Sequence, residues 1–280
     1  MIIIFAAFRN EVRDIIRKVR PAGVAGKSFS AKDNIYHGHI LIGDKKQEVM
    51  ICITGMGLNN AVKAVENLTG TVLENAVFII LGISGSTNEK IKTGDIVIYN
   101  KIVNLDFLTG SRKIDSRNFF DESAEKFKIK SGSISEGFID LNYFKKNKNY
   151  EIFMETGGCV PFLISTRKEK MDIGRNFDVS AVDMESYYIA KRAEVVKIPF
   201  AVIRAVSDDV YAEIPDYFQN FENMKLIDKL ILVIKIIFSV RRLCQVIKLS
   251  KGIKKAVNNL NDFVISEIIP FINKKYFYNP

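Results

Sequence analysis

The sequence is poor in the residues that most often build metal sites, disulfides and nucleophilic catalysts. Tryptophan is absent from its 280 residues, histidine occurs twice and cysteine three times. The cysteines, Cys52, Cys159 and Cys244, are far apart and show no C-x-x-C spacing. This usage is typical of reduced thiols in a cytoplasmic protein, and it argues against a disulfide framework or a cysteine zinc site.

The two histidines, His37 and His39, lie two residues apart on a predicted strand and would point to the same side of it. No carboxylate within that run has the matching parity, and structural metal sites usually need four ligands. Neither histidine has an obvious aspartate partner for a Ser-His-Asp triad. We therefore expect neither a metal ion nor another cofactor.

Several common nucleotide-binding and hydrolase motifs are also missing. The chain has no G-x-x-x-x-G-K-[ST] loop, and no G-x-G-x-x-G follows its first strand. Gly82-Ile83-Ser84-Gly85 differs from the G-x-S-x-G nucleophile elbow. No run reaches the roughly 18 uncharged apolar residues of a membrane span. The apolar residues 1–7 lack a basic leader and are interpreted as a first core strand.

The composition is that of a folded globular protein, with 48% apolar and 26% charged residues. The net charge of +9 is uneven. Residues 221–280 carry eleven Lys and Arg against four Asp and Glu, so most of the excess lies there. The nearly neutral residues 1–220 do not suggest a nucleic-acid partner, and the basic tail needs its own explanation.

Short apolar runs alternate with amphipathic segments over residues 1–220. The strand-like runs, rich in Val, Ile and Phe, are 2–7, 38–42, 49–54, 77–81, 95–99 and 200–206. The helix-like segments are 10–19, 58–73, 166–175 and 184–195, with Asn10 and Asp183 as candidate caps of the first and last. This pattern predicts a three-layer α/β/α domain with a mostly parallel central mixed sheet. The polar stretch 107–149 is expected to be irregular around a weak helix.

Polar motifs follow these predicted strands, at the sheet edge where α/β domains bind ligands. They are Phe8-Arg9-Asn10-Glu11-Val12, Thr54-Gly55-Met56-Gly57, Gly82-Ile83-Ser84-Gly85, Asp183-Met184-Glu185-Ser186 and Arg204-Ala205-Val206-Ser207-Asp208. Together they resemble the nucleoside phosphorylase/nucleosidase family, and within it the methylthioadenosine/S-adenosylhomocysteine nucleosidases. The resemblance covers about residues 1–220.

The resemblance implies cleavage of the N-glycosidic bond of a purine nucleoside. Asp208 matches the general acid that protonates the departing purine. Glu185 matches the carboxylate that accepts hydrogen bonds from the ribose, and Glu11 the base that activates water. The residues that the resemblance places around the substrate are Met184 at the sugar, Phe162 and Leu163 at the base, Ser84 and Arg204 near the attacking water or anion, Ser207 beside the acid, and Phe218 near the 5′ group.

Each of these residues also has an ordinary structural interpretation. Glu11 and Glu185 would suit helix N-termini, whose dipole favours negative charge, and Phe162 and Phe218 would suit a core. A non-catalytic nucleoside-binding module on the same fold is a further alternative. It would not need all three carboxylates, so we expect an enzyme.

Phosphorolysis is the main alternative reaction. Phosphorylases of the family commonly carry an early Gly-Asp-Pro-x-Arg loop, whereas Phe8-Arg9-Asn10-Glu11 here ends in a carboxylate that would repel phosphate. Hydrolysis of a 5′-substituted adenosine is therefore favoured. Gly157-Gly-Cys-Val-Pro161 stands where the methylthioadenosine enzymes have Ser-Gly-Asp, which leaves the 5′ substituent open. Asp183-Met-Glu-Ser186, Ile214-Pro215 and the basic tail also resemble hopanoid-associated members, so a lipid-linked nucleoside of the adenosylhopane type is another candidate.

The resemblance also implies a homodimer, for which residues 103–120 are a candidate contact. In the tail, residues 222–258 interleave apolar and basic side chains at spacings compatible with a helix. One interpretation is a helical C-terminal extension, residues 221–280, packed on the α/β domain. The other is a peripheral membrane contact, which requires both apolar area and cationic charge.

Overall fold

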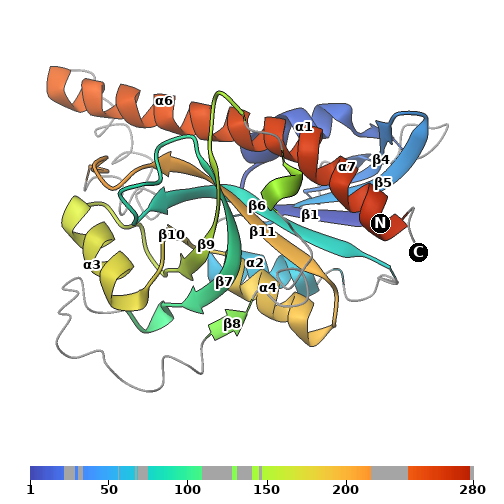
Figure 1. Ribbon diagram of the computed structural model, residues 1–280, viewed down its shortest axis with the longest axis horizontal. Helices are drawn as coiled ribbons and strands as arrows, with labels where there is room; N and C mark the ends of the chain where they lie inside the picture. The colour runs from blue at the N-terminus through green and yellow to red at the C-terminus, as the bar shows by residue number, and fades with distance from the viewer. Residues whose placement is uncertain are drawn as a thin grey trace.

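The computed structural model describes residues 1–21, 29–30, 34–55, 57–66, 68, 75–108, 128–130, 141–144, 147–215 and 239–277. The apolar runs of the sequence form one mixed sheet whose strand order is β10-β9-β7-β11-β6-β1-β5-β4-β2 (Figure 1). Its strands are β1 (Ile2–Ala6), β2 (Arg20–Pro21), β3 (Phe29–Ser30), β4 (Ile35–Ile42), β5 (Lys45–Ile53), β6 (Val77–Ser86), β7 (Ile96–Asn104), β8 (Lys128–Lys130), β9 (Ile152–Cys159), β10 (Ala181–Asp183) and β11 (Phe200–Asp208).

The centre of the sheet is parallel: β1 pairs in parallel with β5 and β6, and β6 with β11. Antiparallel strands flank this centre, with β4 on β5 at one side and β7 on β11 at the other. All five residues of β1 and all nine of β11 are buried. Strands buried on both faces need helices on both sides, which confirms the predicted α/β/α class.

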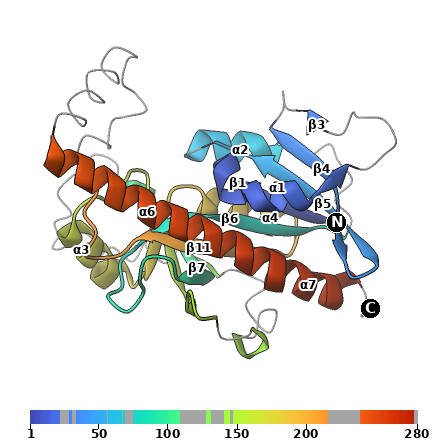
Figure 2. The same ribbon diagram turned by 90° about the horizontal axis from the view of Figure 1, so that it is seen from above.

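Helices cover both faces of this sheet (Figure 2). The helical elements are η1 (Arg9–Val12), α1 (Arg13–Lys18), α2 (Leu58–Glu66), η2 (Asp106–Leu108), η4 (Leu141–Tyr143), α3 (Arg167–Phe177), α4 (Ser186–Val195), α6 (Val240–Phe263), η6 (Val264–Ile268), α7 (Ile269–Ile272) and η7 (Asn273–Phe277). The long helix α6 runs along one face beside α1, and α2 and α4 pack together on the opposite side (Figures 1 and 2).

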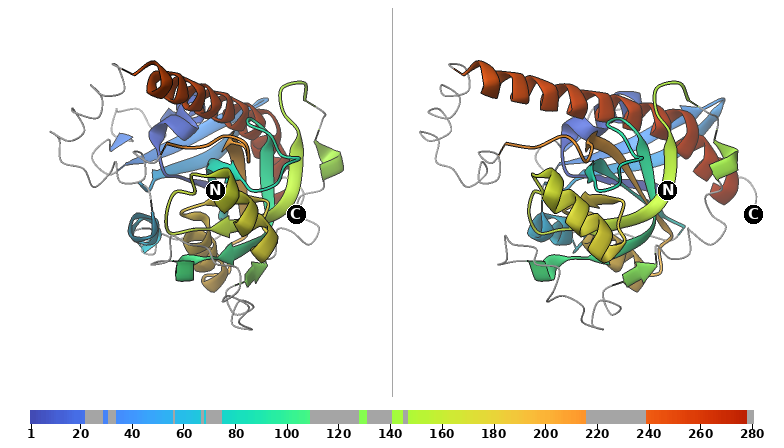
Figure 3. Two further views of the ribbon diagram at one scale, coloured as in Figure 1. Left: turned by 90° about the vertical axis from the view of Figure 1, so that its left-hand side faces the viewer. Right: turned by 60° about the vertical axis from the view of Figure 1, so that its left-hand side comes forward.

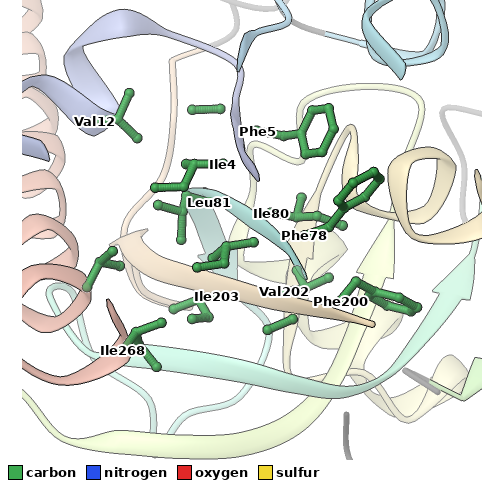
Figure 4. Close-up of a cluster of buried hydrophobic side chains, with 14 of the residues drawn as sticks. Ile4, Phe5, Val12, Phe78, Ile80, Leu81, Phe200, Val202, Ile203 and Ile268 are labelled. Carbon is green, nitrogen blue, oxygen red and sulfur yellow. The ribbon is translucent and has the colours of Figure 1, made fainter. Parts of the chain in front are cut away.

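The core lies between the parallel strands and these helices (Figure 4). Phe5 of β1 and Phe78 of β6 meet edge to face, with ring centroids 4.9 Å apart. Phe200 and Val202 of β11 are also buried in this cluster. A fully buried Phe or Ile side chain contributes roughly 1.5–3 kcal/mol, so these strands form a rigid base for the loops at their ends.

The tail prediction is confirmed where the structure describes it, as a helical C-terminal segment packed on the domain. Leu260, Phe263 and Ile268 are fully buried in the same core as the sheet strands. Gly252 brings α6 so close to β11 that a Cβ there would overlap the Ser207 carbonyl oxygen. Residues 222–238 lie outside the described part of the chain.

The predicted cap of the first helix was wrong. Asn10 lies inside the 3-10 turn η1, and α1 begins after Val12, whose side chain makes no capping bond. The backbone N–H groups of Asp14 and Ile15 instead donate to Oδ1 of Asn261 on α6, both at 3.2 Å. The Nδ2 group of Asn261 donates to the carbonyl of Glu11 at 2.8 Å. A side chain distant in sequence therefore performs the capping.

Strands β8, β9 and β10 were not predicted. Glu155, Gly157 and Gly158 interrupt the apolar pattern of β9, yet β9 pairs in parallel with β7 and β10. Of the stretch 107–149, the described parts include β8 and the short turn η4 but no α-helix.

One of the two histidines, His37, has a partner that the sequence of a single strand could not reveal. Nε2 of His37 lies 2.9 Å from Oε1 of Glu48 on the adjacent strand β5. Among the described residues, no group of three His, Cys, Asp or Glu side chains is placed to hold a metal ion. Within the same residues, no helix is long and apolar enough to cross a membrane.

We predict that Asn261→Ala lowers the free energy of unfolding by about 1–3 kcal/mol, because it leaves buried backbone groups of α1 and η1 without partners. Asn258→Ala is the matched control, since Asn258 is exposed on the same helix and its loss should cost under about 0.5 kcal/mol. Urea unfolding of both variants measures the difference. Equal stability would show that α6 does not support the Glu11 turn.

Candidate active site

Glu11 is held in the turn that follows β1. Its Oε2 accepts a hydrogen bond from the Phe8 N–H at 2.8 Å, and its Oε1 accepts one from the Ile83 N–H at 3.2 Å. The side chain therefore links the ends of the adjacent parallel strands β1 and β6. It is buried, and this burial raises the pKa of its carboxyl, while the nearby Arg204 opposes the rise.

Glu185 comes from the loop between β10 and α4. Asp183 turns this loop, because its Oδ1 accepts the N–H groups of Glu185 and Ser186 at 2.9 and 2.8 Å. Asp183 thus holds the start of the helix as predicted for a cap, but α4 begins at Ser186 and its N-cap residue is Glu185. Oε1 of Glu185 accepts the N–H of Gly57 at 3.0 Å, and Gly57 has a φ of +84° that favours glycine. Burial raises the pKa of Glu185 to about 7.

Arg204 of β11 is the positive centre of this half of the site. Its Nη2 lies 3.2 Å from Oδ1 of Asp183, and both side chains are almost completely buried. The charges of Asp183, Glu185 and Glu11 raise the pKa of Arg204 against the effect of burial. Gly82 makes room for the guanidinium, because a Cβ there would overlap Nη1. One cation therefore balances several buried carboxyls.

Asp208 lies where β11 ends, beside β6. The pairing of these strands skips Ser207, and this bulge sets Asp208 opposite Gly85. Ser207 Oγ is within hydrogen-bond distance of Oδ1 of Asp208 and of the Ser84 carbonyl. Burial raises the pKa of the Asp208 carboxyl. A Cβ on Gly85 would lie 3.1 Å from Oδ2, so glycine leaves space beside the acid.

Lys170 is a residue beside Asp208 that the sequence analysis did not identify. Its Nζ lies 2.6 Å from Oδ2 of Asp208, and the Lys170 side chain is fully buried. The residue lies on α3, the yellow helix at the front of the left view of Figure 3. The available signal was helical spacing, because Lys170 and Ile173 are the two fully buried residues of α3 and lie three positions apart.

The predicted base- and sugar-binding residues lie around a second hydrophobic cluster. Phe162 and Met184 are partly buried and pack against the cluster that contains Val103, Leu105 and Val182. Leu163 follows Phe162 and is partly exposed. Phe218 lies outside the described residues.

Ser84 is buried in β6 next to the Glu11 turn. Its hydroxyl is buried and has no hydrogen-bond partner among the described residues.

A cavity of about 510 Å³ adjoins Asp208 on the side of α6. It is lined by Ser207, Asp208 and Thr93 and by side chains of α6 such as Gln245 and Lys248. Neither Glu11 nor Glu185 is among its lining residues. We therefore do not assign this cavity to the sugar-binding part of the site.

The raised pKa of Glu185 predicts a specific pH dependence of stability. The folded state binds the Glu185 proton more tightly than the unfolded state, in which the pKa of this carboxyl is near 4.5. The stability that the bound proton provides is therefore lost as the pH rises through about 7. A glutamine at this position would not titrate. We expect the free energy of unfolding of Glu185→Gln to rise relative to that of the wild type by up to roughly 3 kcal/mol between pH 4.5 and pH 8.

Chemical denaturation at several pH values measures this effect. Glu194→Gln is the control, since Glu194 is exposed on α4 and pairs only with the exposed Lys191 within the described structure. A stability difference between Glu185→Gln and the wild type that does not change with pH would contradict the assigned environment of Glu185.

Comparison with known proteins shows the family of this chain. The curated 5′-methylthioadenosine/S-adenosylhomocysteine nucleosidase of Staphylococcus haemolyticus is 25% identical over 240 residues, which cover 79% of this chain and 92% of the relative. The enzyme of the same name from Staphylococcus epidermidis is 24% identical over 237 residues, with the same coverage.

Solved structures share the fold. The nucleosidase of that name from Neisseria meningitidis, in complex with methylthio-immucillin-A, overlaps with a TM-score of 0.59 at 16% identity, covering 96% of this chain and 97% of its own. Futalosine hydrolase of Helicobacter pylori overlaps with a TM-score of 0.57 at 13% identity, with the same coverage. The model of the phosphorylase superfamily matches residues 1–237, and the chain belongs to that superfamily.

Proposed function

We propose that this protein is a purine nucleosidase that hydrolyses the N-glycosidic bond of a 5′-substituted adenosine and releases adenine. The observation that carries the proposal is the set of three buried carboxyls, Glu11, Glu185 and Asp208, at the ends of neighbouring strands and loops. The curated relatives carry the name of 5′-methylthioadenosine/S-adenosylhomocysteine nucleosidases, which supports this substrate class.

The reaction needs an acid at the base, and Asp208 suits this role. Adenine departs readily only when a proton on its imidazole ring compensates the electron pair that it takes from the broken bond. A buried carboxyl with a raised pKa holds a proton closer to neutral pH. In this proposal the O–H bond of Asp208 breaks as the purine N7–H bond forms.

The other two carboxyls serve the sugar and the water. As the bond breaks, the ribose ring gains positive charge. An ionised Glu185 stabilises this charge and accepts a hydrogen bond from a ribose hydroxyl. Its pKa of about 7 means that a substantial fraction is ionised at neutral pH. Glu11 removes a proton from the water that attacks the sugar carbon. The oxygen of that water becomes the new hydroxyl of the sugar, and its proton remains on Glu11 until it is released.

Charge balance favours hydrolysis over phosphorolysis. The two buried cations of the described site, Arg204 and Lys170, already lie 3.2 Å from Asp183 and 2.6 Å from Asp208. Glu11 adds a further acidic group beside Arg204. A phosphate ion entering this site would meet more negative than positive side chains, whereas water carries no such penalty.

The proposal predicts that adenine is released at the same rate with and without phosphate, and that the second product is the free sugar. Glu11→Gln should lower the hydrolysis rate by about 10²–10⁴-fold, because it removes the base for water. Asp14→Asn is the control, since Asp14 is on the neighbouring turn and pairs with Arg13 and Arg17 at the surface. Product analysis by chromatography measures both effects. Strict dependence on phosphate, with a sugar 1-phosphate as product, would make the protein a phosphorylase.

The 5′ substituent is set by residues that include some outside the described part of the chain, such as Phe218. The assay should therefore compare adenosine, 5′-methylthioadenosine, S-adenosylhomocysteine, futalosine and an adenosylhopane-type lipid nucleoside. The first three substrates are the most informative, and we expect 5′-methylthioadenosine to be cleaved fastest. Release of purine only from the lipid-linked nucleoside would instead favour the hopanoid-associated alternative.

We also propose that the exposed side of α6 contacts an anionic membrane surface from the cytoplasm. Leu243 and Ile247 are 38% and 45% exposed and lie one helical turn apart. Lys251 and Lys254 continue the same stripe and are exposed. Because α6 also forms core, the test uses Leu243→Gln with Ile247→Gln in the full chain. If the double variant binds anionic vesicles as well as the wild type does, the exposed side of α6 does not contact the membrane.

Finally, we propose a homodimer that completes the 5′ pocket. The family resemblance motivates it, and the exposed Phe107 in the candidate segment 103–120 is compatible with it. Most of that segment lies outside the described residues. Sedimentation at micromolar concentration gives the oligomeric state, and a monomer would count against this proposal.

A further inference from the structure

A buried lysine touches the proposed acid of the reaction. Nζ of Lys170 lies 2.6 Å from Oδ2 of Asp208, 2.7 Å from the Ala212 carbonyl and 2.9 Å from the Asp209 carbonyl. An ammonium group has three N–H donors, and these three acceptors match them one for one. Every donor of the Lys170 ammonium group therefore has an acceptor despite the complete burial of the side chain.

The start of α3 is built to hold this lysine in place. Thr166 caps the helix: its Oγ1 accepts the Glu169 N–H at 3.2 Å, and Oε2 of Glu169 accepts the Thr166 N–H at 2.9 Å. This reciprocal cap fixes the first turn. Lys170 then points inward, whereas Lys168 is 83% exposed and pairs with Asp172 at the surface. Two lysines of one helix thus have opposite environments.

The obvious structural role for Lys170 is to attach the loop after β11 to α3. That attachment has a second support, because the Ile214 N–H donates to the Ser165 carbonyl at 2.9 Å. An apolar side chain could fill the same space without burying a charge, which is costly unless the charge is compensated. A role that requires charge explains the observed pair better than packing alone.

We propose that Lys170 is a positioning residue for the reaction at Asp208: its ammonium group fixes the orientation of the carboxyl and compensates the negative charge that forms there when the proton leaves. This inference rests on the proposed function. When the O–H bond of Asp208 breaks and the purine N7–H bond forms, the carboxyl becomes a carboxylate. Lys170 already lies against Oδ2, so no group has to move to stabilise it.

The charges around Asp208 agree with this role. Burial raises the pKa of its carboxyl, and Lys170 is the largest of the influences that lower it. Ser207 lowers the pKa in the same direction, whereas the neighbouring Asp209 raises it. Without Lys170 the acid would hold its proton more tightly and would donate it less readily to the purine.

The test compares the pH–rate profiles of Lys170→Met, Lys170→Arg and the wild type on 5′-methylthioadenosine. Lys170→Met should lower kcat by about tenfold or more and should leave KM within a few-fold. The limb on which activity falls as Asp208 loses its proton should move to higher pH by about one unit. Lys170→Arg keeps the charge and should restore the position of the limb. Lys168→Met, on the exposed side of α3, should match the wild type.

Two further measurements keep the outcomes distinguishable. In an Asp208→Asn background, Lys170→Met should cause no further loss of rate, because no proton is then transferred. Carbon-13 NMR titration of the Asp208 carboxyl in full-length protein reports the Lys170 effect without turnover. If the wild type cleaves no nucleoside, the proposed function fails, while a titration shift in Lys170→Met would still show the coupling. Identical pH profiles and identical titrations in the wild type and Lys170→Met would overturn the inference.

Discussion

The burial of several carboxyl groups beside very few cations constrains the rest of this structure. Asp183, Glu185 and Glu11 share the influence of Arg204, and Asp208 lies against Lys170. An uncompensated buried charge costs several kcal/mol, so the backbone supplies the remaining partners. The N–H groups of Phe8, Ile83 and Gly57 donate to the Glu11 and Glu185 side chains. The crowded side chains also require glycine at neighbouring positions, because Gly82 and Gly85 leave the space that Arg204 and Asp208 occupy.

The C-terminal helix belongs to the same arrangement. Through Asn261 it caps α1 and holds the backbone of Glu11, and through Gly252 it packs against the carbonyl of Ser207. These contacts reach the ends of β1 and β11, which carry the proposed base and the proposed acid. The apolar face of α6 thus stabilises the site from behind, while its exposed basic stripe remains available for another surface.

Much of the fold could be predicted from the sequence, because local patterns encode it, whereas the three carboxyls were proposed from the family resemblance of the motifs that contain them. Uninterrupted apolar runs indicated β1, β6 and β11, and the motifs after them placed Glu11 and Asp208 at one sheet edge. β9 was missed because Glu155 and two glycines interrupt its apolar pattern.

The residues that support the site depend on contacts between distant parts of the chain. Lys170 meets Asp208 across 38 positions, and Asn261 meets Asp14 across 247. No periodicity in one segment reports such a pairing. The sequence therefore indicated the acidic groups of the site and Arg204, but not Lys170 and Asn261, which also hold the site together.

The central claim is that Asp208 gives a proton to the departing purine, and the acidity of the leaving group tests it most directly. Single-turnover cleavage by Asp208→Asn should be compared for 5′-methylthioadenosine and for the p-nitrophenyl glycoside of the same sugar, whose leaving group needs no proton. We expect a loss of about 10²–10⁴-fold on the nucleoside and under about tenfold on the nitrophenyl glycoside. An equal loss on both substrates, or a loss below tenfold on the nucleoside, would contradict the assignment of Asp208 as the acid.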